Sequence, residues 1–167
     1  LCLETRFEMK LDRIDKVFEI LRDNDPEPVT ELTFKSHFQL LIAVILSAQA
    51  TDKSVNAATA KLFVEAPTPE KLFKLGLRKL KTYIKTIGLY NAKASNVIAT
   101  SEIIWKEYKN KIPQTREELM KLPGVGRKTA NVVLNNAFGQ HTIGVDTHVF
   151  RVSNRLSLAP GKTVVVV

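Results

Sequence analysis

The stretch that decides the fold is LPGVGRKT at residues 122–129, and VDTH at residues 145–148 follows it. Gly124 and Gly126 can both adopt φ > 0, which a side chain disfavours, so the pattern predicts a tight hairpin. We expect a helix over 127–138 directly after it, with its free N–H groups and positive dipole end turned toward the turn. Because neither glycine has a Cβ, a phosphate can approach the backbone closely. The stretch therefore predicts an anion-binding hairpin.

Lys128 stands in the first turn of that helix and has two interpretations. The positive end of the dipole opposes its charge there and favours the neutral, nucleophilic amine. It can equally be a cation that contacts a phosphate. Asp146 follows 18 residues later and could be its acidic partner, although its position also suits the N-cap of a helix over 147–156. The two roles of Asp146 are compatible, because a capping carboxylate is held rigidly.

Composition limits the class of protein. The chain has 167 residues, 44% of them apolar and 25% charged, which fits one globular domain or two small ones. Residues 1–60 carry a net charge of −3 and residues 61–167 a net charge of +11. The basic excess lies in the same part of the chain as the hairpin and favours a polyanionic partner. A generic solubilising surface would give the same count.

Cys2 is the one cysteine, so this sequence cannot form an internal disulfide or a thiolate-ligated cluster. The longest apolar stretch, at 40–46, is too short to span a membrane, and no signal peptide is recognisable. We therefore expect a cytoplasmic protein that does not bind membranes. Because the chain starts at Leu1 and ends in four valines after a loop at 160–162, we also expect a start that lies elsewhere and a truncated C-terminus.

The rest of the sequence predicts helices. Apolar residues recur at helical spacing in the first segment, from residue 11 to residue 21, and two prolines follow it. The segment 36–49 is apolar on nearly every side and predicts a central buried helix. The first segment's apolar residues are Leu11, Ile14, Val17, Phe18 and Leu21, followed by Pro26 and Pro28. Further helices are expected from residue 52, from Pro69, over 77–86 and 91–108, after a capping box at 115–118, and over 147–156. A second glycine turn before a helix, at 87–94, is either another contact with the partner or an ordinary loop.

Four stretches together resemble the endonuclease III family of helix-hairpin-helix DNA glycosylases and AP lyases. They are LLIAVILSAQATDKSVN at 40–56, KTYIKTIGLYNAK at 81–93, LPGVGRKTANVVL at 122–134 and GVDTHVFRVSNR at 144–155. The resemblance covers about residues 10–162. It implies an all-α fold, in which a six-helix barrel domain at 30–139 ends in the helix-hairpin-helix. It further implies an N-terminal helix at 1–29 that packs with a second, incomplete helical domain at 140–167.

The resemblance also implies roles for single residues. Lys128 matches the nucleophile of the family and Asp146 its catalytic carboxylate. Gln49 matches the residue that fills the space left by a flipped base, and the loop of Ile87, Gly88 and Leu89 matches the wedge between the strands. The other residues implied to contact DNA are Asp52, Pro123, Gly124, Val125, Gly126, Arg127, Thr129 and His148.

The implied function is base-excision repair, in which a monomer removes oxidised pyrimidines from duplex DNA and cleaves the abasic strand. This chemistry needs no metal, and we expect it in a bacterial cytoplasm, at the nucleoid. Family members also carry a [4Fe-4S] cluster on four cysteines that this sequence does not contain. Two alternatives stay open at this point: a non-catalytic DNA-binding remnant, and a mismatch adenine glycosylase of the same superfamily, against which Lys128 argues.

Overall fold

A computed structural model describes the backbone of residues 2–167 and the side chains of residues 13–167. Every element within residues 2–167 is a helix, which confirms the predicted all-α class. The valines at 164–167 form no strand. Leu1 and the side chains of Cys2 and Leu11 lie outside the described residues, so their predicted roles are not addressed by the structure.

The chain divides into two compact units. Residues 31–144 form one, which we call the hairpin unit, and residues 1–30 with 145–167 form the other, which we call the terminal unit. The sequence places the divisions at 29/30 and 139/140, and the structure places them at 30/31 and 144/145.

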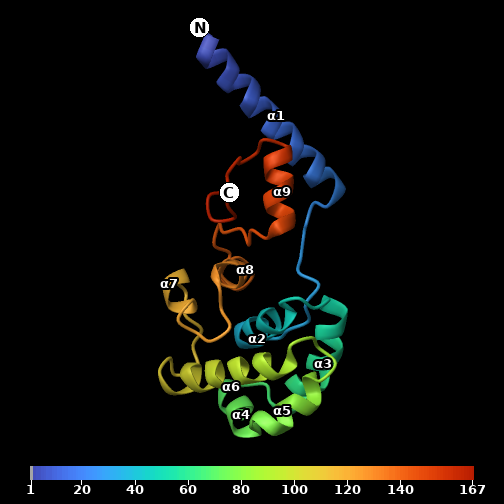
Figure 1. Cartoon of the computed structure of the whole chain (residues 1–167), viewed down its shortest axis with the longest axis vertical. Helices are drawn as coiled ribbons and strands as arrows, with labels where there is room; N and C mark the ends of the chain where they lie inside the picture. The colour runs from blue at the N-terminus through green and yellow to red at the C-terminus, as the bar shows by residue number, and fades with distance from the viewer. Residues whose placement is uncertain (1) are drawn as a thin grey trace. The chain divides into compact units, whose positions relative to one another are not determined.

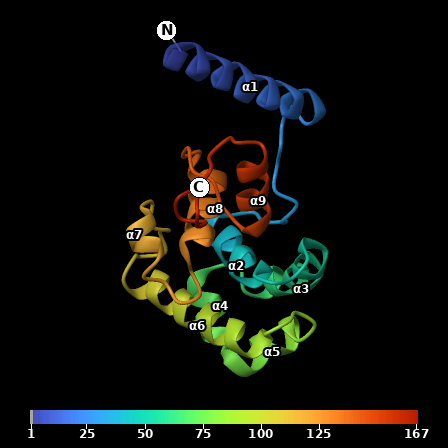
Figure 2. The same ribbon diagram turned by 45° about the horizontal axis from the view of Figure 1, so that its top comes forward.

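Helix α2 (His37–Ser47) is the centre of the hairpin unit. Leu40, Leu41 and Ile42 have no exposed surface, as expected for a helix that is apolar on nearly every side. Ser36 caps it by accepting a hydrogen bond from the N–H of Gln39 at 3.2 Å. Figures 1 and 2 both show α2 between α6 (Tyr90–Lys106) and α8 (Arg127–Phe138), and α2 contacts each of them as well as α3 (Asp52–Glu65).

Two short helices cover the side of α6 that faces away from α2 (Figure 1). They are α4 (Pro69–Leu75) and α5 (Leu77–Ile84), and both contact α6. The predicted capping box begins α7 (Arg116–Leu119), where the Thr115 hydroxyl accepts from the Glu118 N–H at 3.3 Å and donates to the Glu118 carboxylate at 3.0 Å. The order α7, hairpin, α8 is the helix-hairpin-helix that the sequence predicts.

The terminal unit contains α1 (Cys2–Asn24) and α9 (Thr147–Arg155). Helix α1 begins earlier than the apolar pattern indicates and ends before Pro26, as expected. Phe18 and Leu21 are about half exposed, and with Pro26 and Pro28 they border a groove of about 450 Å³. None of the helices within residues 2–167 has the length and apolar character that crossing a membrane requires.

Candidate nucleic-acid interface

The hairpin is held against the side of α6. The Thr100 hydroxyl, fully buried, donates to the carbonyl oxygen of Pro123 at 2.9 Å. Gly124 has the expected left-handed backbone, with φ +80, and a Cβ there would stand 2.9 Å from Nδ2 of Asn96. Only glycine fits such a site without a shift. Asn96 and Thr100, which the sequence did not single out, therefore position the hairpin.

Gly126 differs from the expectation of φ > 0. Its φ is −90 and its ψ is 178, an extended conformation that any residue adopts. A Cβ at Gly126 would have no heavy atom within 4 Å, and the residue supplies no side-chain cap for the first turn of α8. Neither backbone strain nor crowding inside the protein therefore requires glycine here. The absence of a Cβ leaves open space in front of the first amides of α8.

Lys128 is exposed in the first turn of α8, which spans the predicted 127–138. The segment after α8 folds back along this helix through two hydrogen bonds. Asn131 Nδ2 donates to the carbonyl of Ile143 at 2.9 Å, and the Thr142 hydroxyl donates to the carbonyl of Asn131 at 2.7 Å. A Cβ on Gly144 would stand 3.4 Å from Cγ of Lys128, so Gly144 lies against the stem of this lysine. Gly144 is a neighbour that sequence reasoning missed.

Gln49 and the 87–89 loop lie side by side. A Cβ on Gly88 would stand 3.8 Å from the carbonyl oxygen of Gln49. Both loops contain a non-glycine residue in the left-handed region, with φ 55 at Gln49 and φ 58 at Leu89. Such residues store about 1–2 kcal/mol each, and strain of this kind concentrates at functional sites. Gln49 is exposed and Leu89 is 64% exposed, so two strained side chains are presented together.

Burial separates the predicted contact residues into two groups. Ile87 and Val125 are only 2% and 7% exposed, so their side chains anchor the two loops in the core. Arg127 and Gly126 are exposed, and Asp52 and Thr129 are half-buried. The 87–94 segment does contain a turn before a helix, but Leu89 adopts the left-handed conformation in place of Gly88.

The loop of residues 87–89, which we call the wedge loop, leads into α6, and the hairpin packs against the same helix. Leu89 is the N-cap of α6, and Asn96 packs against Gly124 seven residues later, about 10 Å along the axis. The hairpin unit thus brings together the hairpin, Lys128 and the loop of Gln49 and Leu89 on neighbouring helix ends.

Two predicted site residues belong to the terminal unit. Asp146 is the N-cap of α9, as its position indicates, and one carboxylate oxygen accepts from the N–H groups of His148 and Val149, both at 2.9 Å. The His148 ring lies 3.3 Å from the Arg151 guanidinium. The carboxylate of Asp146 is therefore held in a fixed orientation by its own helix.

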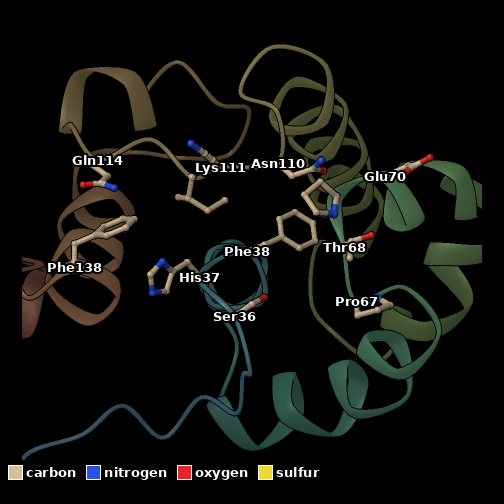
Figure 3. Close-up of a pocket in the computed structure, with 12 residues that line it drawn as sticks. Ser36, His37, Phe38, Pro67, Thr68, Glu70, Asn110, Lys111, Gln114 and Phe138 are labelled. Carbon is tan, nitrogen blue, oxygen red and sulfur yellow. The ribbon is translucent and has the colours of Figure 1, made fainter.

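A cavity of about 730 Å³ lies at the opposite ends of the same helices. Figure 3 shows His37 at the start of α2 facing Phe138 at the end of α8, with ring centroids 4.8 Å apart, and Asn110 and Lys111 beyond the end of α6. None of the predicted site residues lines it. The cavity is therefore distinct from the hairpin site.

No group of three His, Cys, Asp or Glu side chains that could hold a metal occurs among residues 13–167. The [4Fe-4S] cluster that the resemblance implies needs four thiolates, and the printed sequence supplies Cys2 only. The residues present do not fit this cluster.

The fold defines a helix-hairpin-helix protein with an exposed lysine beside the hairpin, and comparisons with known proteins identify its family. Residues 42–165 match the profile of the HhH-GPD superfamily base excision DNA repair proteins. Endonuclease III of Escherichia coli (strain K12) is 62% identical over 144 residues, which cover 86% of this chain and 68% of that protein. Endonuclease III of Rickettsia prowazekii is 57% identical over 159 residues, covering 95% and 75%.

Two solved structures have the same fold. A non-covalent endonuclease III–DNA complex matches with a TM-score of 0.86 and 43% identity, over 92% of this chain and 72% of that one. A trapped endonuclease III–DNA covalent intermediate matches with a TM-score of 0.81 and 43% identity, over 97% and 73%. The chain belongs to the endonuclease III family of the HhH-GPD superfamily.

Proposed function

We propose that this base-excision DNA glycosylase and AP lyase removes oxidised pyrimidines from duplex DNA, with Lys128 as its nucleophile. The observation that carries the proposal is the exposed lysine in the first turn of α8, two residues after a glycine, Gly126, that the fold itself does not require. A phosphate bound at the hairpin would hold the sugar next to it close to the Lys128 amine.

The hairpin holds one strand by its phosphates, and the basic excess of residues 61–167 adds sequence-independent attraction. Leu89 enters the base stack and Gln49 occupies the space of the extruded nucleotide, since chemistry on a base requires that it leave the stack. The exposure and the shared position of these two side chains support these roles.

In the chemical step, the neutral amine of Lys128 donates its lone pair to C1′ of the sugar, and the bond from C1′ to the base breaks with its electrons going to the base. The sugar ring opens to give a protonated Schiff base. Loss of a proton from C2′ then expels the 3′ phosphate oxygen by β-elimination. Asp146 stabilises the positive charge that develops on the sugar or accepts the proton of the lysine.

Borohydride trapping tests this proposal, because it reduces the Schiff base to a stable adduct. The wild-type chain should form a covalent adduct with a duplex that contains one oxidised pyrimidine. Lys128→Ala should form none, and Lys121→Ala, which removes another exposed lysine before the hairpin, should trap as well as wild type. An adduct of equal yield from Lys128→Ala would refute the assignment.

The two alternatives are not favoured. A non-catalytic DNA-binding remnant would bind DNA without releasing a base, and a mismatch adenine glycosylase would release adenine without a strand break. Duplex DNA is the partner of this protein. Three points stay predictions: the preference for oxidised pyrimidines, the monomeric state and the location at the nucleoid. Product analysis on a panel of lesions would check the first, and sedimentation measurements would check the second.

A further inference from the structure

Helix α6 carries three polar residues on the side that faces the hairpin. Lys93, Asn96 and Thr100 follow each other at i, i+3 and i+7, and residues at this spacing share one face of a helix. Thr100 binds the carbonyl of Pro123, and Asn96 packs against Gly124. The two segments are antiparallel here: the residue nearer the start of α6, Asn96, contacts the later hairpin residue, Gly124. The next position toward the start of α6 on this face is Lys93, and the next part of the hairpin is the start of α8.

Lys93 is an unusual residue for this place. It is 5% exposed, and its Nζ atom has no hydrogen-bond partner among the described residues. Burial lowers the pKa of the Lys93 ammonium below its usual value. An apolar side chain of similar length would avoid the cost of desolvating this charge. The packing of the core therefore does not explain a lysine here.

The backbone of Lys93 connects the same position to the wedge loop. Its N–H donates to the carbonyl oxygen of Leu89 at 3.1 Å and so closes the first turn of α6. Lys93 thus belongs both to the helix start that presents Leu89 and to the face that holds the hairpin. It lies between the two parts of the proposed DNA site.

We propose that Lys93 is a positioning residue whose buried ammonium stands behind the hairpin and strengthens the binding of a DNA phosphate there. A positive charge in a poorly solvated interior acts on a nearby anion over a longer range than an exposed one. Asn96 and Thr100 hold the hairpin against the face of α6 on which Lys93 lies. The inference rests on the proposed function, because it takes the hairpin as the phosphate site.

Lys93→Met is the decisive variant, because it removes the charge and keeps the length of the side chain. Binding is measured by fluorescence anisotropy on a duplex with a tetrahydrofuran abasic analogue, which does not react. We expect binding about 5- to 30-fold weaker than wild type, together with equal or greater resistance to urea. The salt dependence of binding should keep its slope, since a buried lysine releases no counterion from DNA.

Two further variants give the experiment its controls. Lys61→Met removes an exposed lysine of α3 in the same unit and should bind within about twofold of wild type. Lys93→Arg keeps the charge and should retain most of the affinity, so it remains informative if Lys93→Met does not fold.

Several results would overturn the inference. One is an affinity of Lys93→Met within twofold of wild type. A second is a loss of affinity in Lys61→Met or Lys93→Arg equal to that in Lys93→Met. A third is a loss of affinity in Lys93→Met that accompanies a lower resistance to urea. A salt slope reduced by about one would indicate direct contact between Lys93 and a phosphate, which also contradicts a position behind the hairpin. If the wild-type chain does not prefer the abasic analogue over undamaged DNA, the proposed function fails instead.

Discussion

Replacement of each hairpin glycine by alanine should separate folding from DNA binding. Gly124 has φ +80 and Gly126 has φ −90, so the same added methyl group meets two different backbones. At Gly124 the left-handed conformation costs about 1–2 kcal/mol for a residue with a Cβ. The methyl group would also stand 2.9 Å from Nδ2 and 3.0 Å from Cβ of Asn96, and overpacking of this kind adds about 1–3 kcal/mol. We therefore expect Gly124→Ala to lower the free energy of unfolding by about 2–5 kcal/mol.

At Gly126 the expected effect on stability is close to zero. The extended backbone accepts alanine, and its Cβ would face open space. Alanine is a weaker N-cap than glycine by roughly 0.5 kcal/mol, but it also restricts the unfolded chain, which offsets about the same amount. A phosphate at the hairpin would meet this methyl group directly. The loss of one charge-assisted hydrogen bond, about 1.5–3 kcal/mol, corresponds to binding about 10- to 100-fold weaker.

The single tryptophan, Trp105 in α6, reports unfolding in urea, and anisotropy with the abasic analogue at fixed salt reports binding. Gly124→Ala should unfold at lower urea, whereas Gly126→Ala should unfold like wild type and bind weakly. The reasoning is refuted if Gly126→Ala binds DNA like wild type. It is also refuted if the two substitutions lower the stability equally, because the contrast depends on their different backbones.

Three further predictions follow from single contacts. Thr100→Val should lower the free energy of unfolding by about 0.5–1.5 kcal/mol in the same urea assay, because the half-buried Pro123 loses the donor to its carbonyl. Leu89→Gly should raise stability by up to about 1 kcal/mol, because it relieves φ 58 at the N-cap of α6, while base excision in a single-turnover assay falls; an unchanged excision rate would exclude the wedge role. The unfolding free energy of wild type relative to Lys93→Met should rise as pH increases from the lowered pKa of Lys93 toward its ordinary value. Within this window the unfolded chain binds the Lys93 proton more tightly than the folded chain, so a difference that stays flat or falls as the pH rises would contradict the burial of the ammonium.

Much of the hairpin unit could be predicted from the sequence, because its signals are local. The capping box at Thr115 involves residues within three positions of one another and forms as expected, and so does the cap at Asp146 in the terminal unit. The helix over 127–138 has the predicted bounds for the same reason.

The contacts that hold the site together could not be predicted in this way. Thr100 and Pro123 are 23 residues apart, and nothing in the local pattern of either shows that they pair. Asn96, Lys93 and Gly144 likewise acquire their roles only when α6, the hairpin and the segment after α8 come together. One signal was available, since polar residues at positions 93, 96 and 100 interrupt the otherwise apolar face of α6 at helical spacing.

The error at Gly126 is informative about function. A glycine normally indicates a strained backbone or a crowded neighbour within the protein, and Gly124 has both. Gly126 has neither. Gln49 and Leu89 show the opposite mismatch, because they occupy left-handed conformations that glycine would adopt with less strain. Gln49 and Leu89 cost stability where they stand, and Gly126 gains none from being glycine, so the fold alone does not account for these three residues. Left-handed backbone also occurs at Lys109, Asn110 and Ser157, so the contact of Gly126, Gln49 and Leu89 with DNA stays a prediction. The buried charge of Lys93 is likewise not explained by the packing of the core. We therefore predict that Gly126→Ala, Leu89→Gly and Lys93→Met share one result: undiminished stability with impaired action on DNA.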